Sequence, residues 1–198
     1  MPRFSSLSLT LFVLGPVLGL TVLLGGCDRE SGGAAQQGAQ DSKIKPPPGL
    51  PGEIDRTHKG SRAPVMSFMD PDHKVFDLSE LGGKPTLVNL WATWCAPCVI
   101  EMPQLDQLAD DYQGRLRVVT LSQDMQGSVK VKPFFAARKF RHLEPWLDPE
   151  NALIFHYGGG ILPLTVMYDA KGREVWRIAG GYDWSSKEGR ALIEEGLR

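Results

Sequence analysis

The chain has 198 residues, 22 of them basic and 23 acidic, and 42% of its residues are hydrophobic. The near balance of charge argues against a nucleic-acid-binding protein, which would carry a basic surplus. The hydrophobic share fits a globular domain and is too low for a protein that crosses a membrane many times. Three cysteines and four scattered histidines are too few for a disulfide scaffold or a four-cysteine zinc site.

An uncharged, largely apolar segment runs from residue 4 to residue 27, and Arg3 is the only charge before Asp28. It ends in the string Leu24-Gly25-Gly26-Cys27. A signal peptidase needs small side chains before its cut, so the string predicts a signal peptide over residues 1–26. The string also resembles the bacterial lipobox, which implies a lipid-modified Cys27 as the first mature residue. An uncleaved signal anchor is the alternative.

Either outcome predicts a domain outside the cytoplasm, where disulfide chemistry is possible. By the lipobox resemblance, Asp28 directly after the cysteine implies that the lipid anchor stays at the inner membrane and that the domain faces the periplasm. A lipid chain anchors a protein to a membrane without spanning it.

Residues 27–60 are rich in Gly, Ala, Gln, Ser and Pro, and residues 46–52 read PPPGLPG. Such a segment buries too little apolar surface to offset its ordering entropy. We therefore predict a flexible tether with a stiffer proline-rich part, and a proline ligand for a partner is the alternative. Residues 61–198 remain as one domain, long enough for a real core.

The predicted elements of this domain alternate between strands and helices. Residues 65–68 and 74–77 flank a turn-like cluster and predict a hairpin. Residues 86–91 form a β-prone run that suits a central strand buried on both faces. Further elements are expected at 98–112 (helix), 116–121 (strand), 129–140 and 150–157 (helices), 164–168 and 173–178 (paired strands) and 185–197 (helix). This order predicts an α/β fold, in which a mixed central sheet has helices on both faces.

The string Trp94-Cys95-Ala96-Pro97-Cys98 lies where the first central strand gives way to its helix. A helix start presents free backbone N–H groups and a partial positive charge, which favour the thiolate that acts as nucleophile. The spacing places Cys98 one turn into the helix, close enough to Cys95 for a disulfide, and Pro97 suits a first helical turn. Cys95 would attack a substrate disulfide, and Cys98 would resolve the mixed disulfide.

Other readings of a Cys-x-x-Cys motif are weaker here. Residue 99 is Val where a haem-attachment motif has His, and zinc would need two further ligands. An inert structural disulfide fits poorly with a strand-to-helix position. A copper(I) carrier that uses two thiolates remains an alternative. The chain has no NAD(P)H or flavin motif, so we predict no bound cofactor and no metal.

Residues 61–198 resemble the thioredoxin superfamily and, more narrowly, the membrane-anchored TlpA/ResA-type thiol–disulfide oxidoreductases. The resemblance is strongest in residues 87–98, which read LVNLWATWCAPC, and in Glu101-Met102-Pro103 just beyond. It implies a thioredoxin-like fold with an N-terminal hairpin extension and an insertion between Ser122 and Tyr157.

The string Gly160-Ile161-Leu162-Pro163-Leu164-Thr165 matches the family's cis-proline loop. The match implies that Pro163 is cis and that Leu162 and Pro163 face the dithiol and bind substrate. Trp94 and Pro97 are expected to shape the same docking surface, and plain packing is the alternative role for Trp94.

Two polar residues separate this chain from thioredoxin itself. Thioredoxin has a buried acid where this chain has Asn89, and an amide cannot shuttle a proton. ResA-like proteins have a glutamate that matches Glu101, three residues after Cys98 and on a neighbouring face of the helix. The match implies that Glu101 tunes or delivers protons, and a solvated surface carboxylate is the alternative.

The resemblance implies a monomeric reductant that acts on protein disulfides in cytochrome c maturation or in assembly of the copper site of cytochrome oxidase. Electrons would come from a membrane thiol reductase, because the chain has no cofactor of its own. An oxidative disulfide foldase and a non-enzymatic copper(I) carrier are the alternative functions.

Overall fold

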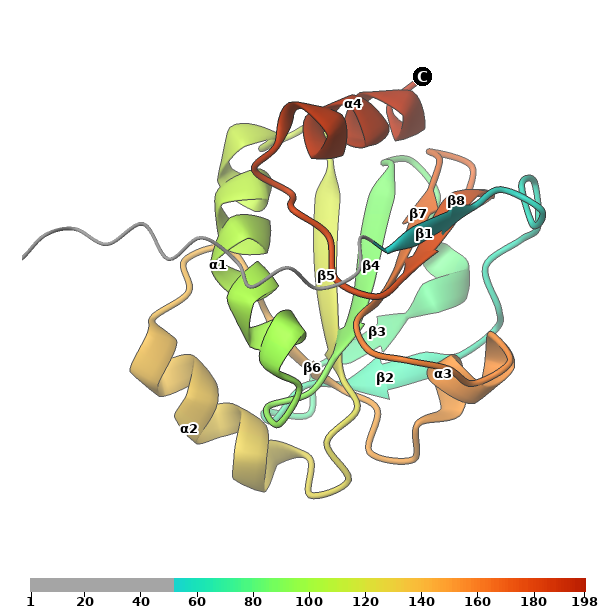
Figure 1. The fold of residues 1–198 in the computed structure, drawn as a ribbon. Helices are drawn as coiled ribbons and strands as arrows, with labels where there is room; N and C mark the ends of the chain where they lie inside the picture. Colours follow the sequence, from blue (N-terminus) through green and yellow to red (C-terminus); the bar gives the residue numbers. More distant parts are fainter. Residues whose placement is uncertain (1–51) are drawn as a thin grey trace, which may run out of the picture. The chain divides into compact units, whose positions relative to one another are not determined.

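The computed structural model describes residues 52–198, which form an eight-stranded mixed sheet with helices on both faces (Figure 1). The strand order is β1-β8-β7-β4-β5-β6-β2-β3. The predicted leader, Cys27 and most of the predicted tether lie outside the described residues. Within residues 52–198, no helix has the length and apolar character needed to cross a membrane.

The elements have the following bounds in chain order. The strands are β1 (Glu53–Asp55), β2 (Ser67–Met69), β3 (Val75–Asp77), β4 (Thr86–Trp91), β5 (Arg117–Ser122), β6 (Pro145–Leu147), β7 (Leu164–Tyr168) and β8 (Glu174–Ala179). The helices are the short 3₁₀ helix η1 (Leu78–Glu80) and the α-helices α1 (Ala96–Asp111), α2 (Ser128–Arg138), α3 (Ala152–His156) and α4 (Lys187–Gly196).

Strand β4 is the centre of the sheet, and all six of its residues are buried. It pairs in parallel with β5 and antiparallel with β7. Successive side chains of a strand point to opposite faces. Leu87 and Trp91 therefore join one core cluster, and Val88 and Leu90 join the other. A strand buried on both faces explains why its sequence is a continuous β-prone run.

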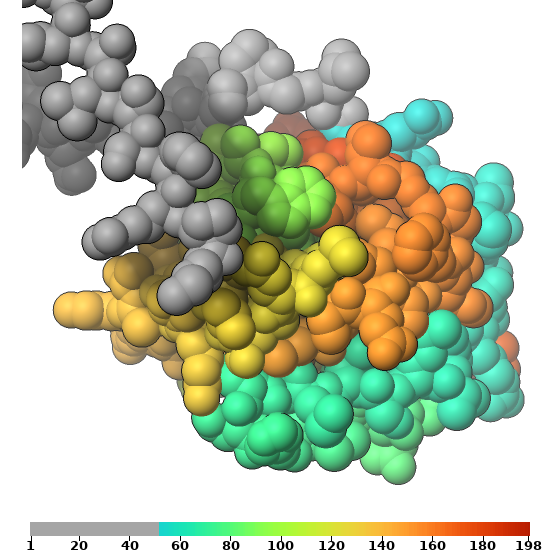
Figure 2. All heavy atoms as spheres, turned by 90° about the horizontal axis from the view of Figure 1, so that it is seen from below, coloured from blue at the N-terminus to red at the C-terminus, as the bar shows by residue number. Residues whose placement is uncertain are grey.

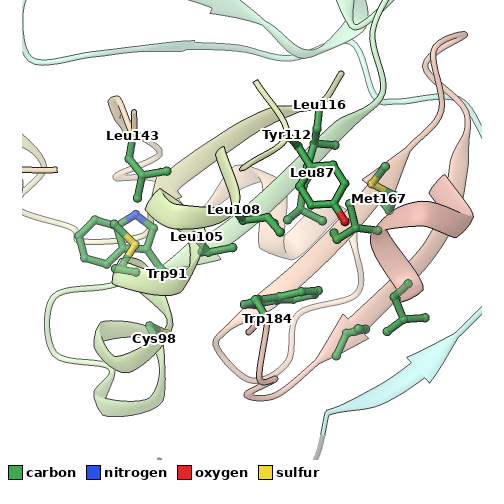
Figure 3. Close-up of a cluster of buried hydrophobic side chains, with 14 of the residues drawn as sticks. Leu87, Trp91, Cys98, Leu105, Leu108, Tyr112, Leu116, Leu143, Met167 and Trp184 are labelled. Carbon is green, nitrogen blue, oxygen red and sulfur yellow. The ribbon is translucent and has the colours of Figure 1, made fainter. Parts of the chain in front are cut away.

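The two core clusters lie on opposite faces of the sheet. Helices α1, α2 and α4 contribute to the first cluster, and η1 and α3 contribute to the second. Figure 3 shows the first cluster, in which Leu105 and Leu108 of α1 lie near Leu87 and Trp91 of β4. The predicted helix spacing of apolar residues is thus the face of α1 that packs on the sheet.

The structure confirms the predicted mixed sheet with helices on both faces and adds three elements. Strand β6 lies in the predicted insertion and pairs in parallel with β5, and η1 follows the hairpin. Strand β1 lies in the residues that we assigned to the tether and pairs with β8, so the sheet begins earlier than residue 61. Strands β1 and β6 have three residues each, and neither is joined to a neighbouring strand by a turn-like cluster such as the one that predicts β2 and β3, which is why the sequence did not predict them.

Four strand ends meet at one edge of the sheet. The register pairs Trp91 with Ser122, Leu90 with Leu164, and Leu164 with Ala179. The C-terminal ends of β4, β5 and β8 therefore lie beside the N-terminal end of β7. Figure 2 views the molecule from this side, and the segments around residues 95, 125 and 160 meet there as green, yellow and orange surfaces.

Candidate redox site

Cys95 is the N-cap of helix α1, which begins at Ala96 as soon as the chain leaves β4. The backbone N–H of Cys98 donates a hydrogen bond to Cys95 Sγ over 3.3 Å. An unpaired N–H of the first helical turn therefore points at the sulfur, where it and the helix dipole stabilise negative charge. Pro97 lies in the first turn, where its missing N–H removes no helical bond.

Cys95 and Cys98 form a disulfide, with their Cα atoms 5.3 Å apart. Cys95 is 6% exposed and Cys98 only 1%. Both residues are buried, and Cys95 is the less buried of the two, so the attacking role of Cys95 stays a prediction. Trp94 is 69% exposed, and Ala96 and Pro97 are exposed as well. Trp94 is thus a surface residue beside the disulfide and not a packed core residue.

The peptide bond between Leu162 and Pro163 is cis, and it lies just before β7. Because β7 pairs with β4, this loop is at the same edge of the sheet as the disulfide. The Pro163 carbonyl accepts a hydrogen bond from the Gly180 N–H over 2.8 Å, which ties the loop to the end of β8. Ile161, one residue before Leu162, is exposed.

Glu101 is 3% exposed, so the structure buries the side chain that could also have been a solvated surface carboxylate. Its Oε1 atom accepts a hydrogen bond from the Tyr182 N–H, and its Oε2 atom lies 3.5 Å from Asn89 Nδ2. Burial raises the pKa of the Glu101 carboxyl to about 8, although Tyr182, the Trp184 side chain and Asn89 lower it in part. The carboxyl therefore titrates near neutral pH.

Asn89 and Thr165 lie in the sheet on the side of Glu101 that faces β4 and β7. They are cross-strand neighbours on β4 and β7, and Asn89 Nδ2 donates to Thr165 Oγ1 over 2.9 Å. Asn89 is thus a hydrogen-bonded core residue, as its chemistry predicts. It gives the Glu101 carboxyl one weak polar contact and offers no group that could take its proton.

The loop after β8 covers Glu101 from the other side. A methyl group on Gly181 would lie 3.5 Å from Pro97 Cβ and 3.6 Å from Glu101 Oε1, so this loop lies against the first turns of α1. The Gly181 carbonyl accepts the Gly52 N–H over 2.9 Å. The residue that leads into β1 therefore holds the cover of Glu101 in place.

Asp124 is a further buried acid at this edge, and the sequence analysis missed it. It is the second residue after β5, and both of its carboxylate oxygens accept hydrogen bonds from Thr93, two residues before Cys95. Its burial depends on the register of β4 and β5, so no local sequence pattern could have identified it.

The described loops at the edge that carries the disulfide contain no basic residue. Within the described residues, the four loops at this edge are 92–95, 123–127, 158–163 and 180–183, and none of them contains Lys, Arg or His. Residues 85–114, which include all of α1, contain none either. The site can therefore exchange a disulfide at the start of a helix next to a titrating carboxyl, without a nearby cation.

Comparison with known proteins agrees with this geometry. Residues 58–192 match the family model described as Redoxin. The thiol-disulfide oxidoreductase ResA of Bacillus thuringiensis is 30% identical over 131 residues, which cover 66% of this chain and 75% of that protein. The thioredoxin-like protein YneN of Bacillus subtilis is 30% identical over 116 residues, or 58% of this chain and 67% of that protein.

Among solved structures, a thioredoxin-family thiol:disulfide interchange protein from Chlorobium tepidum superposes with a TM-score of 0.59 and 26% identity. The match covers 71% of this chain and 98% of that one. The match agrees with the predicted thioredoxin-like fold. The chain belongs to the Redoxin family of the thioredoxin superfamily and is a thiol–disulfide oxidoreductase.

Proposed function

We propose that this protein reduces disulfides of partner proteins outside the cytoplasm, and that the Cys95–Cys98 dithiol is its electron donor. The observation that carries the proposal is the charge around the disulfide. A dithiol protein is a strong oxidant when its reduced form is stabilised, and nearby cations stabilise the thiolate of that form. The four loops at this edge supply none, and they add the buried acid Asp124.

The start of α1 stabilises the Cys95 thiolate enough to make it a nucleophile. Without a neighbouring cation, this stabilisation leaves the disulfide favoured over the dithiol. A protein whose disulfide is favoured passes electrons on to partners, so the charge pattern supports a reductant and argues against an oxidative foldase.

The cycle balances electrons and protons as follows. The Cys95 thiolate attacks one sulfur of the partner disulfide, and the other partner sulfur leaves as a thiolate and takes a proton. Cys98 then loses its proton and attacks Cys95 Sγ, which releases the second partner sulfur. Two electrons pass to the partner, and Cys95 and Cys98 end as the disulfide. Of the two protons that the partner takes up, one comes from Cys98 and the other from solvent, to which Cys95 released its proton when it became a thiolate. A thiol reductase must then return two electrons.

Glu101 is the group that can take the proton of Cys98. The two residues are three apart on α1, so they lie on neighbouring faces of the same turn. The raised pKa of the Glu101 carboxyl, about 8, is close to the ordinary value of a thiol. Proton transfer between groups of matched pKa needs little driving force, and burial keeps water from competing.

The proposal includes the place and the partners of the reaction. The leader and the lipobox-like string support a lipid anchor on Cys27 and a domain on the outer side of the inner membrane. The resemblance to ResA-type proteins supports substrates in cytochrome c maturation or in copper-site assembly of cytochrome oxidase, with a membrane thiol reductase as donor.

The redox potential tests the direction of electron flow. We expect an equilibrium titration against glutathione to give a potential below about −200 mV, nearer to thioredoxin at about −270 mV than to the strong oxidant DsbA at about −120 mV. A value close to that of the strong oxidant would contradict the reductant and support the foldase.

Trapping identifies the partners. We expect Cys98→Ser to accumulate mixed disulfides between Cys95 and its natural partners, because the resolving thiol is absent. Complexes that disappear on reduction would be recovered from membranes of the native host and identified by mass spectrometry. Cys95→Ser is the matched control, and equal yields from both variants would show that Cys95 is not the attacking residue.

The pKa of Glu101 predicts how stability depends on pH. Between its ordinary value of 4.5 and about 8, the folded protein holds a proton that the unfolded chain has released. The free energy of unfolding therefore falls as pH rises through this window. In Glu101→Gln, we expect this fall to be smaller by roughly 1 kcal/mol per pH unit, measured by denaturant unfolding of the oxidised protein.

The exposed Glu150 supplies the control for this experiment, because Glu150→Gln makes the same change in solvent. We expect its pH profile to follow that of the parent protein. Parallel profiles for Glu101→Gln and the parent would show that the Glu101 carboxyl does not titrate in this window.

Lipidation of Cys27 makes a separate prediction. In the native host, mass spectrometry of the membrane fraction should find a diacylglyceryl group on Cys27 as the first residue. Cys27→Ser should abolish both the modification and the cleavage before it. An unmodified Cys27 that is still joined to Gly26 would leave the signal anchor as the correct reading.

A further inference from the structure

We infer that Asp124 is a positioning residue of the redox site, which fixes Cys95 by clamping the loop before it to the end of β5. Asp124 Oδ2 accepts the Thr93 N–H over 2.9 Å, and Oδ1 accepts the Thr93 hydroxyl over 2.7 Å. Oδ2 also accepts the Ser122 hydroxyl over 2.8 Å. A buried carboxylate with three donors holds a fixed orientation, since each lost bond would leave a buried polar group unpaired.

The clamp extends the parallel pairing of β4 and β5 by two residues. The last paired residues of the strands are Trp91 and Ser122. Two residues further along each chain, Thr93 and Asp124 come face to face. Between them, the Gln123 N–H donates to the Trp91 carbonyl over 2.7 Å. The loop that carries Cys95 is therefore held in register with its neighbour after the ladder has ended.

Cys95 depends on this register because its sulfur must meet the first turn of α1. The Cys95 N–H donates to the Ala92 carbonyl over 3.1 Å, so residues 92–95 form a tight turn whose one side-chain clamp is at Thr93. If Thr93 is released, the turn can rotate and the sulfur moves away from the Cys98 N–H. The thiolate then loses its stabilisation.

The same clamp sets the distance between two exposed apolar side chains. Trp94 directly follows Thr93 and is 69% exposed, and Met125 directly follows Asp124 and is 82% exposed. Both lie at the edge of the sheet that carries the disulfide, where their segments are neighbours on the surface (Figure 2). Asp124 therefore also positions two apolar side chains on the surface that a partner of Cys95 would contact.

Asp148 provides a matched control. It is the first residue after β6, as Asp124 is the second after β5, and it is equally buried, at 3% exposure each. Its carboxylate accepts the Ala152 and Leu153 N–H groups, both over 2.9 Å, at the start of α3. Its carboxylate has no hydrogen bond to residues 92–95 among the described residues, and its backbone N–H donates to the Ser122 carbonyl over 2.8 Å, a bond that alanine keeps. Loss of the Asp148 side chain thus reproduces the loss of a buried, hydrogen-bonded acid without removing a bond of the clamp.

The test compares the reactivity of Cys95 in Asp124→Ala, Asp124→Asn and Asp148→Ala, each reduced and alkylated with iodoacetamide near neutral pH. We expect Asp124→Ala to lower the rate constant about tenfold or more, since small misplacements of a reacting group carry losses of this size. We expect Asp148→Ala to stay within about twofold of the parent, because its lost hydrogen bonds affect only the stability of α3.

Asp124→Asn separates geometry from charge. Its amide oxygen can accept the Thr93 N–H, and its NH₂ group can donate to the Thr93 hydroxyl, which rotates to accept. We expect this variant to keep at least about one third of the parental rate, because the clamp survives without the charge. The rate of reaction with oxidised glutathione should follow the same order across the variants.

Two outcomes would overturn the inference: Asp124→Ala that reacts as fast as Asp148→Ala, or Asp124→Asn that is as slow as Asp124→Ala. Circular dichroism establishes that each variant is folded at the assay temperature. If Asp124→Ala does not fold, Thr93→Val removes the hydroxyl bond and keeps the volume. It should then give a partial loss of rate, and a parental rate for Thr93→Val would contradict the clamp.

Discussion

The first turn of helix α1 is the interaction on which the chemistry of this protein depends. The Cys98 N–H meets the Cys95 sulfur because β4 ends at the edge of the sheet and α1 begins there at once. Parallel pairing with β5 fixes where β4 ends, and the packing of α1 on Leu87 and Trp91 fixes its direction (Figure 3). The sheet thus acts as the rigid support that a precisely placed nucleophile requires.

With no cation in the surrounding loops, this helix start has to supply the thiolate stabilisation by itself. A helix dipole contributes about 0.3–1 kcal/mol at an exposed site and more in a partly buried one, and it falls off within a turn. Because this stabilisation is small and short-ranged, it makes a sulfur reactive only when the sulfur is accurately placed. The loops that hold Cys95 therefore affect its reactivity as much as the residues that touch it.

The sequence predicts the parts of this protein that have local patterns. The β-prone run at 86–91 gives β4 with its observed bounds, and the Cys-x-x-Cys spacing identifies the disulfide. The burial of Glu101 also has a local signal, because Glu101 lies between Cys98 and Leu105 on the apolar stripe of α1. A charged side chain on such a stripe can be buried for a function or can reach solvent at the margin of the stripe. The loop at Gly181, which covers Glu101, shows that the side chain is buried.

Other features depend on which segments pair, and a single sequence does not contain that information. Residues 53–55 form strand β1 only because they pair with β8, whereas their own sequence predicts part of a tether. Asp124 is a clamp only because the register of β4 and β5 brings it opposite Thr93. Both features arise from contacts between residues far apart in the chain, for which local propensity is a weak guide.

The two buried acids at this edge, Asp124 and Glu101, differ in the balance between burial and hydrogen bonding. Asp124 accepts three hydrogen bonds, so its carboxylate is fully paired and suits a structural clamp. Tyr182, the Trp184 side chain and Asn89 all lower the pKa of the Glu101 carboxyl, but burial outweighs them and raises this pKa to about 8. Asp124 therefore suits a role in holding the loop before the nucleophile, whereas Glu101 suits the exchange of a proton. The amide of Asn89 gives Glu101 only a weak contact, 3.5 Å long, where a positively charged partner would lower the pKa of the carboxyl much further. A neutral amide at this position therefore helps to keep Glu101 in the range in which a thiol titrates.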